Sequence, residues 1–218
     1  MDGGGFPIDL ILFGMIAAFL VLRLRSILGR RTGFERQPTP ISAAQTGPMI
    51  DAQAEPVAPI SNRSLPDPAG LVGQALVRMR GIDRNFDSGN FLNGAEGAFR
   101  MIVAAFAAGD RQSLKGLLSD DTYRSFESVI AAREAAGHKQ ISELRAIHAA
   151  TIEGAELAGN TARISVRFVS DQISLTEDAG GAPVAGTDAV TELVDIWSFE
   201  RDLTSSDPAW RLVAAASA

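Results

Sequence analysis

The feature that most constrains this chain is an apolar run near its N-terminus. From residue 10 to residue 22 no side chain is charged or polar. A helix needs about 20 residues to cross the hydrocarbon core of a bilayer, which is about 30 Å thick. Residues 6–28 reach that length if Arg23 and Arg25 extend toward the headgroups. We therefore predict a short tail at residues 1–5 and a transmembrane helix at residues 6–28, with a buried core helix or a longer signal segment as alternatives.

Four arginines beside this segment predict its orientation. Arg23, Arg25, Arg30 and Arg31 have no acidic residue among them, and basic residues next to a transmembrane helix favour the cytoplasmic side. The tail lacks the positive charge of a cleaved signal segment, and no Arg- and Ser-rich targeting helix precedes the run. We expect an uncleaved single-pass anchor in a bacterial inner membrane, a cytoplasmic C-terminal domain, and contact between these four arginines and lipid headgroups.

Residues 29–67 are predicted to form a linker that is first basic and then rich in proline. Prolines occupy positions 38, 40, 48, 56, 59 and 66, and the stretch shows little apolar periodicity. Such a sequence buries too little apolar surface to offset the entropy of ordering. A proline-rich recognition motif is the alternative, but no cluster of PxxP motifs with basic flanks is present.

Charge and composition exclude several classes of function. The 218 residues carry a net charge of −6. Residues 1–67 hold six acidic residues and six arginines, so the domain at residues 68–218 carries the whole excess of negative charge. This overall charge lacks the electrostatic footprint of a strongly basic nucleic-acid binder. The absence of cysteine excludes thiol catalysis and Cys-ligated metals, and the usual nucleotide, zinc-protease and serine-hydrolase motifs are absent. We expect no nucleic-acid partner, no cofactor, no metal and no enzymatic activity.

The first half of the domain shows the apolar spacing of helices. A first helix is predicted over residues 71–86, and its apolar stripe consists of Leu71, Ala75, Met79, Ile82 and Phe86. A second helix begins after an N-cap at Asp87 or Ser88 and stops at Gly109. A short third helix covers residues 114–118, and a fourth begins at Ser119 and ends at Gly137.

The second half shows the composition of strands. Residues 144–157, 161–177, 189–202 and 209–216 are Val-, Ile-, Thr- and Trp-bearing runs separated by turn sequences. In the second run the apolar residues change parity, which predicts a bulge or bend near residues 169–171. Helices followed by a meandering sheet predict an α+β fold, with the helices on the concave face of an antiparallel sheet of about four strands.

A curved sheet of this kind can enclose a pocket. The candidate lining residues are the large side chains expected on the inner face: Phe99, Tyr123, Ile130, Phe168, Leu193, Trp197 and Trp210. The alternative, which we weigh more heavily, is that these side chains pack the core.

Two segments resemble a known family. Residues 90–133 contain AFAAGD, LL and YxxF in order, and residues 190–215 contain DxWxFERD and DPxWxL. Together they resemble the C-terminal domain of the matrix-side anchor subunit of the mitochondrial inner-membrane protein-import motor. Residues 23–35, RLRSILGRRTGFE, are similar to the bacterial members called the TimA family. The resemblance implies a cone-shaped NTF2-like fold that serves as a membrane-associated platform for recruiting other proteins.

The resemblance also implies where the domain meets its partners. The family contacts cardiolipin-type lipids through the first helices of the domain, and the matching helix here carries Arg78, Arg80 and Arg84. We expect an inner-membrane adaptor whose cytoplasmic domain binds a protein partner and touches anionic lipid. The alternative is a module that binds a small molecule or a lipid acyl chain in the cone pocket.

Catalysis is the weaker expectation. Other families with this fold use a pocket carboxylate with a His or Tyr. By that analogy, Asp195 or Asp171 is the candidate base and His148 or Tyr123 the candidate acid.

Overall fold

The computed structural model describes residues 62–218, and over this range the chain has an α+β fold as predicted. Four helices lie between a short first strand and four longer ones. In chain order the elements are β1 (Asn62–Ser64), α2 (Leu71–Ile82), α3 (Ser88–Ala108), α4 (Arg111–Leu117), α5 (Asp120–Ala135), β2 (Lys139–Ala158), β3 (Thr161–Glu177), β4 (Pro183–Asp202) and β5 (Arg211–Ser217). The predicted transmembrane helix at residues 6–28 and the four arginines beside it lie outside the described residues. Between residues 62 and 218, no helix combines the length and apolarity needed to cross a bilayer.

The strands form one sheet in the order β1-β2-β3-β4-β5. Strands β2 to β5 pair antiparallel, whereas β1 pairs parallel with β2. The expectation of about four antiparallel strands is therefore corrected to five strands in a mixed sheet. The fifth strand, Asn62–Ser64, falls within the predicted linker. Three residues are too few to show the alternation that identifies a strand in a sequence.

The ends of the helices follow from their capping residues. The Asp87 carboxylate accepts a hydrogen bond from the Asn90 amide at 2.8 Å and begins α3. Gly109 ends α3 with φ of 69°, a left-handed conformation that glycine adopts without steric cost. Asp110 and Ser119 begin α4 and α5 in the same way as Asp87. The predicted starts of the second and fourth helices are thus confirmed.

Helix α2 is shorter than predicted. It ends at Ile82, so Phe86 is buried from the following loop rather than from the helix. Leu71 is 87% exposed and Ile82 is 38% exposed, and the predicted apolar stripe is wrong at these two positions. The helix is anchored instead through Ala75, Leu76 and Met79. The loop before α2 packs closely on it, because a Cβ atom at Gly73 would lie 2.1 Å from the Asp67 carbonyl oxygen.

Three irregularities bend β2 across the sheet. Its 20 residues pair with the 17 residues of β3, so Arg145, His148 and Glu153 are extra residues without a direct partner in β3. Extra residues of this kind curve a strand and increase its twist. Two of these shifts lie opposite residues 169–172 of β3, where the extra residues belong to β2. The pairing of β3 with β4 shifts between Gln172 and Ser174, just after the predicted bulge.

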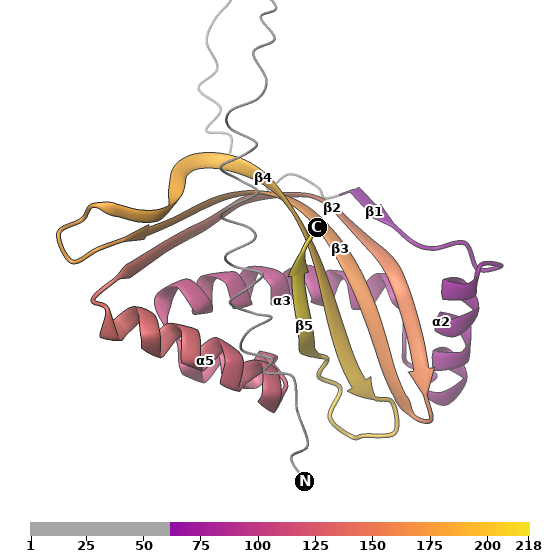
Figure 1. Cartoon of the computed structure of the whole chain (residues 1–218). Coiled ribbons are helices and arrows are strands. Elements are labelled where there is room, and N and C mark those ends of the chain that lie inside the picture. The colour runs from indigo at the N-terminus through magenta and orange to yellow at the C-terminus, as the bar shows by residue number, and fades with distance from the viewer. Residues whose placement is uncertain (1–61) are drawn as a thin grey trace, which may run out of the picture. The chain divides into compact units, whose positions relative to one another are not determined.

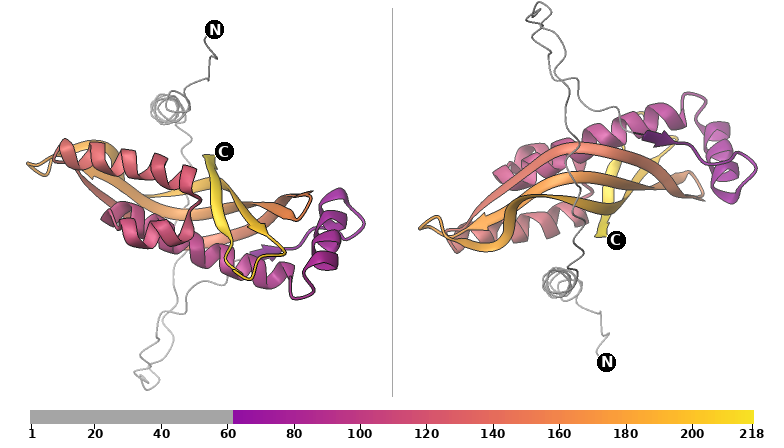
Figure 2. Two further views of the ribbon diagram at one scale, coloured as in Figure 1. Left: turned by 90° about the horizontal axis from the view of Figure 1, so that it is seen from below. Right: turned by 90° about the horizontal axis from the view of Figure 1, so that it is seen from above.

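The curved sheet arches over α3 and α5, which lie against its concave face (Figure 1). Inward-facing side chains of β3 alternate regularly from Ala162 to Gln172. In the centre of the core, the Phe99 ring of α3 stacks on Phe168 with centroids 4.4 Å apart and meets the Trp197 ring edge-on at 4.6 Å. The views from below and above show the helices on one side only, and no helix of residues 62–218 covers the outer face of the sheet (Figure 2).

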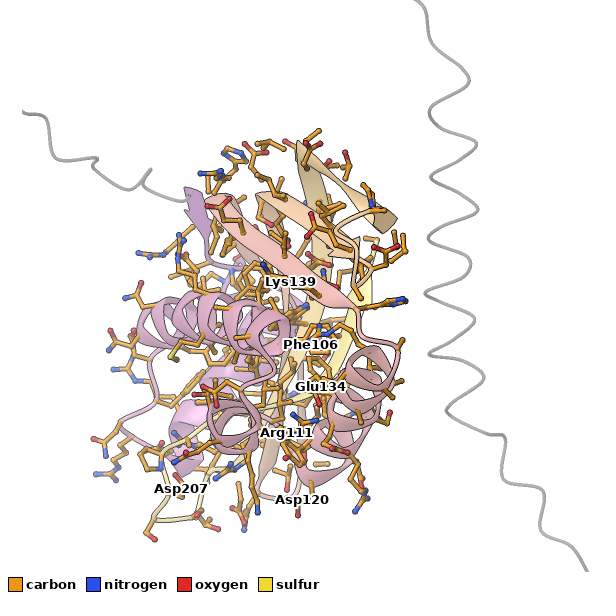
Figure 3. All side chains as sticks on the ribbon, turned by 90° about the vertical axis from the view of Figure 1, so that its left-hand side faces the viewer. Phe106, Arg111, Asp120, Glu134, Lys139 and Asp207 are labelled. Atoms are coloured by element: carbon orange, nitrogen blue, oxygen red, sulfur yellow. The ribbon has the colours of Figure 1, made fainter. Side chains whose placement is uncertain are left out.

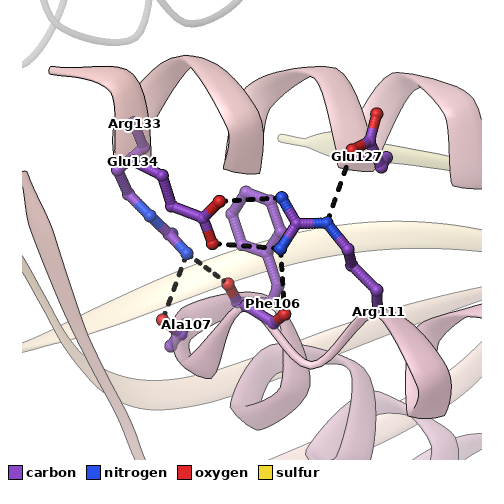
Figure 4. A network of polar contacts seen from close by, with 7 residues as sticks. Phe106, Ala107, Arg111, Glu127, Arg133 and Glu134 are labelled. Atoms are coloured by element: carbon purple, nitrogen blue, oxygen red, sulfur yellow. Dashed lines mark hydrogen bonds and ion pairs between the residues drawn. The ribbon is translucent and has the colours of Figure 1, made fainter.

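A polar network joins α3, α4 and α5 where the three helices meet (Figure 3). The Arg111 guanidinium donates two hydrogen bonds to the Glu134 carboxylate, at 3.0 and 2.8 Å. Arg133 donates to the carbonyl oxygens of Phe106 and Ala107 at the end of α3 (Figure 4). The hydrogen bonds from Arg111 lower the pKa of Glu134. Arg133 thus satisfies the Ala107 carbonyl at the end of α3 and adds a second donor at Phe106, whose carbonyl also accepts from the Gly109 amide.

Candidate binding surfaces

An apolar groove of about 390 Å³ lies beside the N-terminal half of α3. Its walls come from the loop after α2, from α3, from the end of α4 and from the β4–β5 connection. The lining residues are Asn85, Phe86, Asp87, Asn90, Phe91, Gly94, Ala95, Ala98, Met101, Leu117, Phe199, Arg201, Pro208, Ala209 and Trp210. Segments distant in the sequence therefore build a single groove.

Four aromatic rings form the apolar wall of the groove. The Trp210 ring meets Phe91 edge-on with centroids 4.8 Å apart and lies 5.9 Å from Phe86. Phe91 in turn contacts Phe199 of β4 at 6.1 Å. Phe86, Phe91 and Phe199 are buried, whereas Met101 is 53% exposed and leaves apolar surface open at the groove. Tilted and edge-on ring pairs are favourable arrangements of aromatic side chains.

Polar side chains surround this apolar wall. The Arg201 guanidinium lies 5.4 Å from the centre of the Trp210 ring and forms a largely buried ion pair with Asp83. A hydrogen bond from the Asn85 backbone amide lowers the pKa of Asp83, and a hydrogen bond from Arg201 makes a smaller contribution in the same direction. The side-chain amides of Asn85 and Asn90 form no hydrogen bond with any of residues 62–218. They are available to backbone groups of a bound polypeptide.

The solvent-facing side of α2 is the second candidate surface. It presents Arg78 and Arg80, with Arg84 just beyond the helix, and Val77 is 64% exposed beside them. The sequence of α2 contains no Asp or Glu. Within the described part of the chain none of the three arginines forms an ion pair, and the nearby Asp83 is engaged with Arg201. The surface is therefore both basic and apolar.

A second hollow of about 480 Å³ adjoins this helix. Leu65, Val77, Arg80 and Phe86 are among its lining residues. Leu65 is 55% exposed. Asp67 and Asp87 also line the hollow, so it extends the apolar character of the α2 surface toward the loop before the helix but not its basic character.

The comparisons with known proteins identify the family. The model of the Tim44-like domain matches residues 72–217. The chain belongs to the Tim44-like domain family. This confirms the predicted resemblance to the import-motor anchor, whereas the narrower TimA assignment stays a prediction. No curated protein sequence matches the chain.

Three solved structures are similar to the Tim44-like domain. The intermembrane-space region of the chloroplast protein ARC6 has a TM-score of 0.44 at 10% identity and covers 58% of this chain and 95% of its own. A putative dehydratase of the NTF2-like family from Streptomyces avermitilis has a TM-score of 0.35 at 14% identity, covering 60% of this chain and 96% of its own. A conserved protein from Planctomyces limnophilus has a TM-score of 0.33 at 18% identity, covering 56% of this chain and 90% of its own.

The residues predicted to line a pocket occupy different environments in the Tim44-like domain. Phe99, Ile130 and Phe168 are fully buried and Trp197 is 7% exposed, so these four side chains pack the core. Tyr123 is partly buried against the core, and Leu193 is partly exposed on β4 opposite Ser170. Trp210 lines the groove. The sequence analysis missed Phe86, Phe91, Phe199 and Met101 as groove residues.

The candidate acid and base residues form one pair, on the outer face of the sheet. His148 Nε2 lies 2.9 Å from Asp171 Oδ2, with the two side chains 44% and 32% exposed. Asp195 lies on the inner face and accepts hydrogen bonds from Gln172 and Ser217, with neither histidine nor tyrosine among its partners in the described residues. Burial raises the pKa of Asp195, and the two hydrogen bonds oppose this effect. The structure therefore does not bring an acid and a base together at Asp195.

Proposed function

We propose that this chain is a membrane-anchored adaptor that binds a protein partner in the aromatic groove of its Tim44-like domain. In this proposal, residues 6–28 cross a bacterial inner membrane and the linker at residues 29–67 holds the domain in the cytoplasm. Family membership supports a role as a membrane-associated platform. The uninterrupted apolar run and the four arginines after it support the anchor and its orientation.

The groove is the observation that carries this proposal. It combines an apolar aromatic wall, a partly exposed Met101, and an arginine stacked on Trp210. Tryptophan and arginine around a central hollow are typical of the few residues that dominate binding energy in protein interfaces. The two unpaired side-chain amides, Asn85 and Asn90, fit a polypeptide that offers both an apolar side chain and backbone hydrogen-bonding groups.

Substitution of Gly94 tests the groove directly. Gly94 lines it, and a Cβ atom added there would meet no other atom within 4 Å. Gly94→Arg therefore fills the groove without disturbing the packing of α3. Gly97→Arg is the matched control, because Gly97 is in the same helix, has the same free space and does not line the groove.

The measurement is quantitative mass spectrometry of proteins that co-purify with the full chain from membranes. We expect Gly94→Arg to reduce recovery of a specific protein by at least about tenfold, and Gly97→Arg to retain it. Equal recovery with both variants would contradict a partner in the groove. Co-purified lipid that is displaced only by Gly94→Arg would instead favour the alternative function, a module that binds a lipid acyl chain or a small molecule.

Contact between α2 and anionic lipid is a second proposed function, because this helix presents arginines and apolar side chains with no acidic residue. Each basic residue near an anionic surface contributes about 1 kcal/mol, so three contribute roughly 3 kcal/mol. The net charge of −6 on the domain opposes approach to the membrane, and the anchor favours it by raising the effective concentration. An anionic phospholipid such as cardiolipin is the proposed ligand.

A further inference from the structure

Three neighbouring strands bring a histidine and two carboxylates together on the outer face of the sheet. Asp171 of β3 and Glu192 of β4 are direct cross-strand partners. His148 is one of the extra residues of β2, placed between Ile147, which pairs with Ser170, and Ala149, which pairs with Val169. One potential ligand atom from each of these three residues lies within 4.8 Å of the other two. Within residues 62–218, this is the one such group of three.

In the described part of the chain neither carboxylate has an arginine or lysine partner, and the one ion-pair contact is between Asp171 and His148. Elsewhere on β2, Glu143 pairs with Arg145, and Glu153 pairs with Arg167 of β3. By contrast, neither Asp171 nor Glu192 forms an ion pair with an arginine or a lysine of residues 62–218. Two adjacent carboxylates repel each other, and a bound cation removes this repulsion.

We propose that His148, Asp171 and Glu192 bind a divalent transition-metal ion of the zinc class. One imidazole nitrogen and two carboxylate oxygens form a ligand set that suits Zn²⁺, whereas Mg²⁺ and Ca²⁺ prefer oxygen ligands alone. Three protein ligands leave a fourth position for water or for a side chain of a bound partner.

The geometry requires only small movements of exposed side chains. Tetrahedral ligands at about 2.1 Å from zinc lie about 3.4 Å from one another. The separation of 2.9 Å between His148 Nε2 and Asp171 Oδ2 must widen slightly, and separations approaching 4.8 Å must shrink. The His148 and Asp171 side chains are 44% and 32% exposed, so rotation about their side-chain bonds does not disturb the core.

Isothermal titration of the metal-free full chain with ZnCl₂ in detergent tests the proposal. We expect His148→Ala, Asp171→Asn and Glu192→Gln each to weaken zinc binding by at least about tenfold, because loss of an outer-shell contact alone weakens metal sites by 10- to 100-fold. His138→Ala is the matched control, since His138 is the other histidine of the chain. Glu156→Gln is a control for an exposed carboxylate on β2. Both controls should bind zinc like the unmodified chain.

Cobalt substitution provides a second readout. Co²⁺ bound by nitrogen and oxygen ligands gives visible absorption that should decrease in the three site variants and persist in the two controls. Tryptophan fluorescence establishes that each variant is folded. The proposal would be overturned if the full chain bound no zinc, or if the site variants bound zinc as tightly as the controls.

Discussion

Asp195 shows how the environment of one residue decides its chemistry. It lies opposite Phe168 on the inner face of the sheet. Gln172 and Ser217 donate hydrogen bonds to it at 3.2 and 3.1 Å, and no cation pairs with it within residues 62–218. Burial of a carboxylate disfavours its charged form, which raises the pKa of Asp195 above its ordinary value of 3.8. The residue is thus a destabilising charge rather than half of an acid–base pair.

Replacing Asp195 by asparagine should stabilise the domain at neutral pH. Because its pKa is raised, the folded state binds a proton at Asp195 more tightly than the unfolded state. Its favourable contribution is present at acidic pH and is lost as pH rises through the raised pKa. Asparagine carries no charge at any pH, so Asp195→Asn avoids this loss of stability at neutral pH while it keeps the size of the side chain.

The free energy of unfolding of the full chain in urea measures this effect. Fluorescence reports on the domain alone, because both tryptophans, Trp197 and Trp210, lie in it. The advantage of Asp195→Asn over the unmodified chain should be present near pH 7, shrink as the pH falls through the raised pKa of Asp195, and vanish below its ordinary value of 3.8. A variant that is less stable than the unmodified chain at neutral pH would contradict this assignment.

Single residues were predictable where the local chain determines their role. Asp87, Gly109 and Ser119 begin or end helices through contacts with their immediate neighbours, and the sequence predicts all three. The groove was not predictable in this way. Phe91 and Trp210 are about 120 positions apart in the sequence, and periodicity identifies an inward-facing aromatic residue without showing whether it lies in the middle of the core or at its edge.

Helix α2 is the element whose exposed surface differs most from that of an ordinary surface helix. Periodicity predicted its existence and its inward face at Ala75 and Met79. Leu71 and Ile82 are the first and last residues of α2. The C-terminal end lies next to Asp83, which pairs with Arg201, 118 positions away. A contact between residues so far apart cannot be predicted from the local sequence around α2.

Hydrogen exchange of α2 tests its proposed contact with lipid. In the full chain reconstituted in nanodiscs, exchange of Leu71–Ile82 should be slower with cardiolipin or phosphatidylglycerol than with phosphatidylcholine. Neutralising Arg78, Arg80 and Arg84 to Gln should remove about 3 kcal/mol of attraction, roughly a hundredfold in the docked population. The triple Arg→Lys variant keeps the charge and should retain the protection. Equal exchange in anionic and neutral nanodiscs would refute the contact.

The strands show a similar limit. The sequence predicts β3 at its observed bounds, Thr161–Glu177, because a run rich in Val and Ile lies between two turn sequences. The bend of β2 depends on extra residues such as His148, which are defined only by pairing with another strand. A cluster such as His148, Asp171 and Glu192 therefore becomes visible only when the register of three strands is known.

At the scale of the whole molecule, the chain divides its charge and its apolar surface between different parts. The apolar run and its arginines lie in the first 31 residues, whereas the excess negative charge lies in the domain. The domain carries its aromatic groove beside α3 and three arginines without an ion pair within residues 62–218, on α2 and just after it. This division suits an adaptor, which needs one surface for the membrane and another for a partner.

Site-specific photo-crosslinking in cells tests the central claim, that the groove binds a protein. Met101 is 53% exposed and lines the groove, so it is replaced by p-benzoylphenylalanine in the full chain. Glu156, which is exposed on β2 outside the groove, is the control position. We predict that a defined protein is crosslinked from position 101, is not crosslinked from position 156, and is lost when Gly94→Arg is added. Crosslinks from position 101 to lipid alone, or to the same proteins as from position 156, would contradict this account.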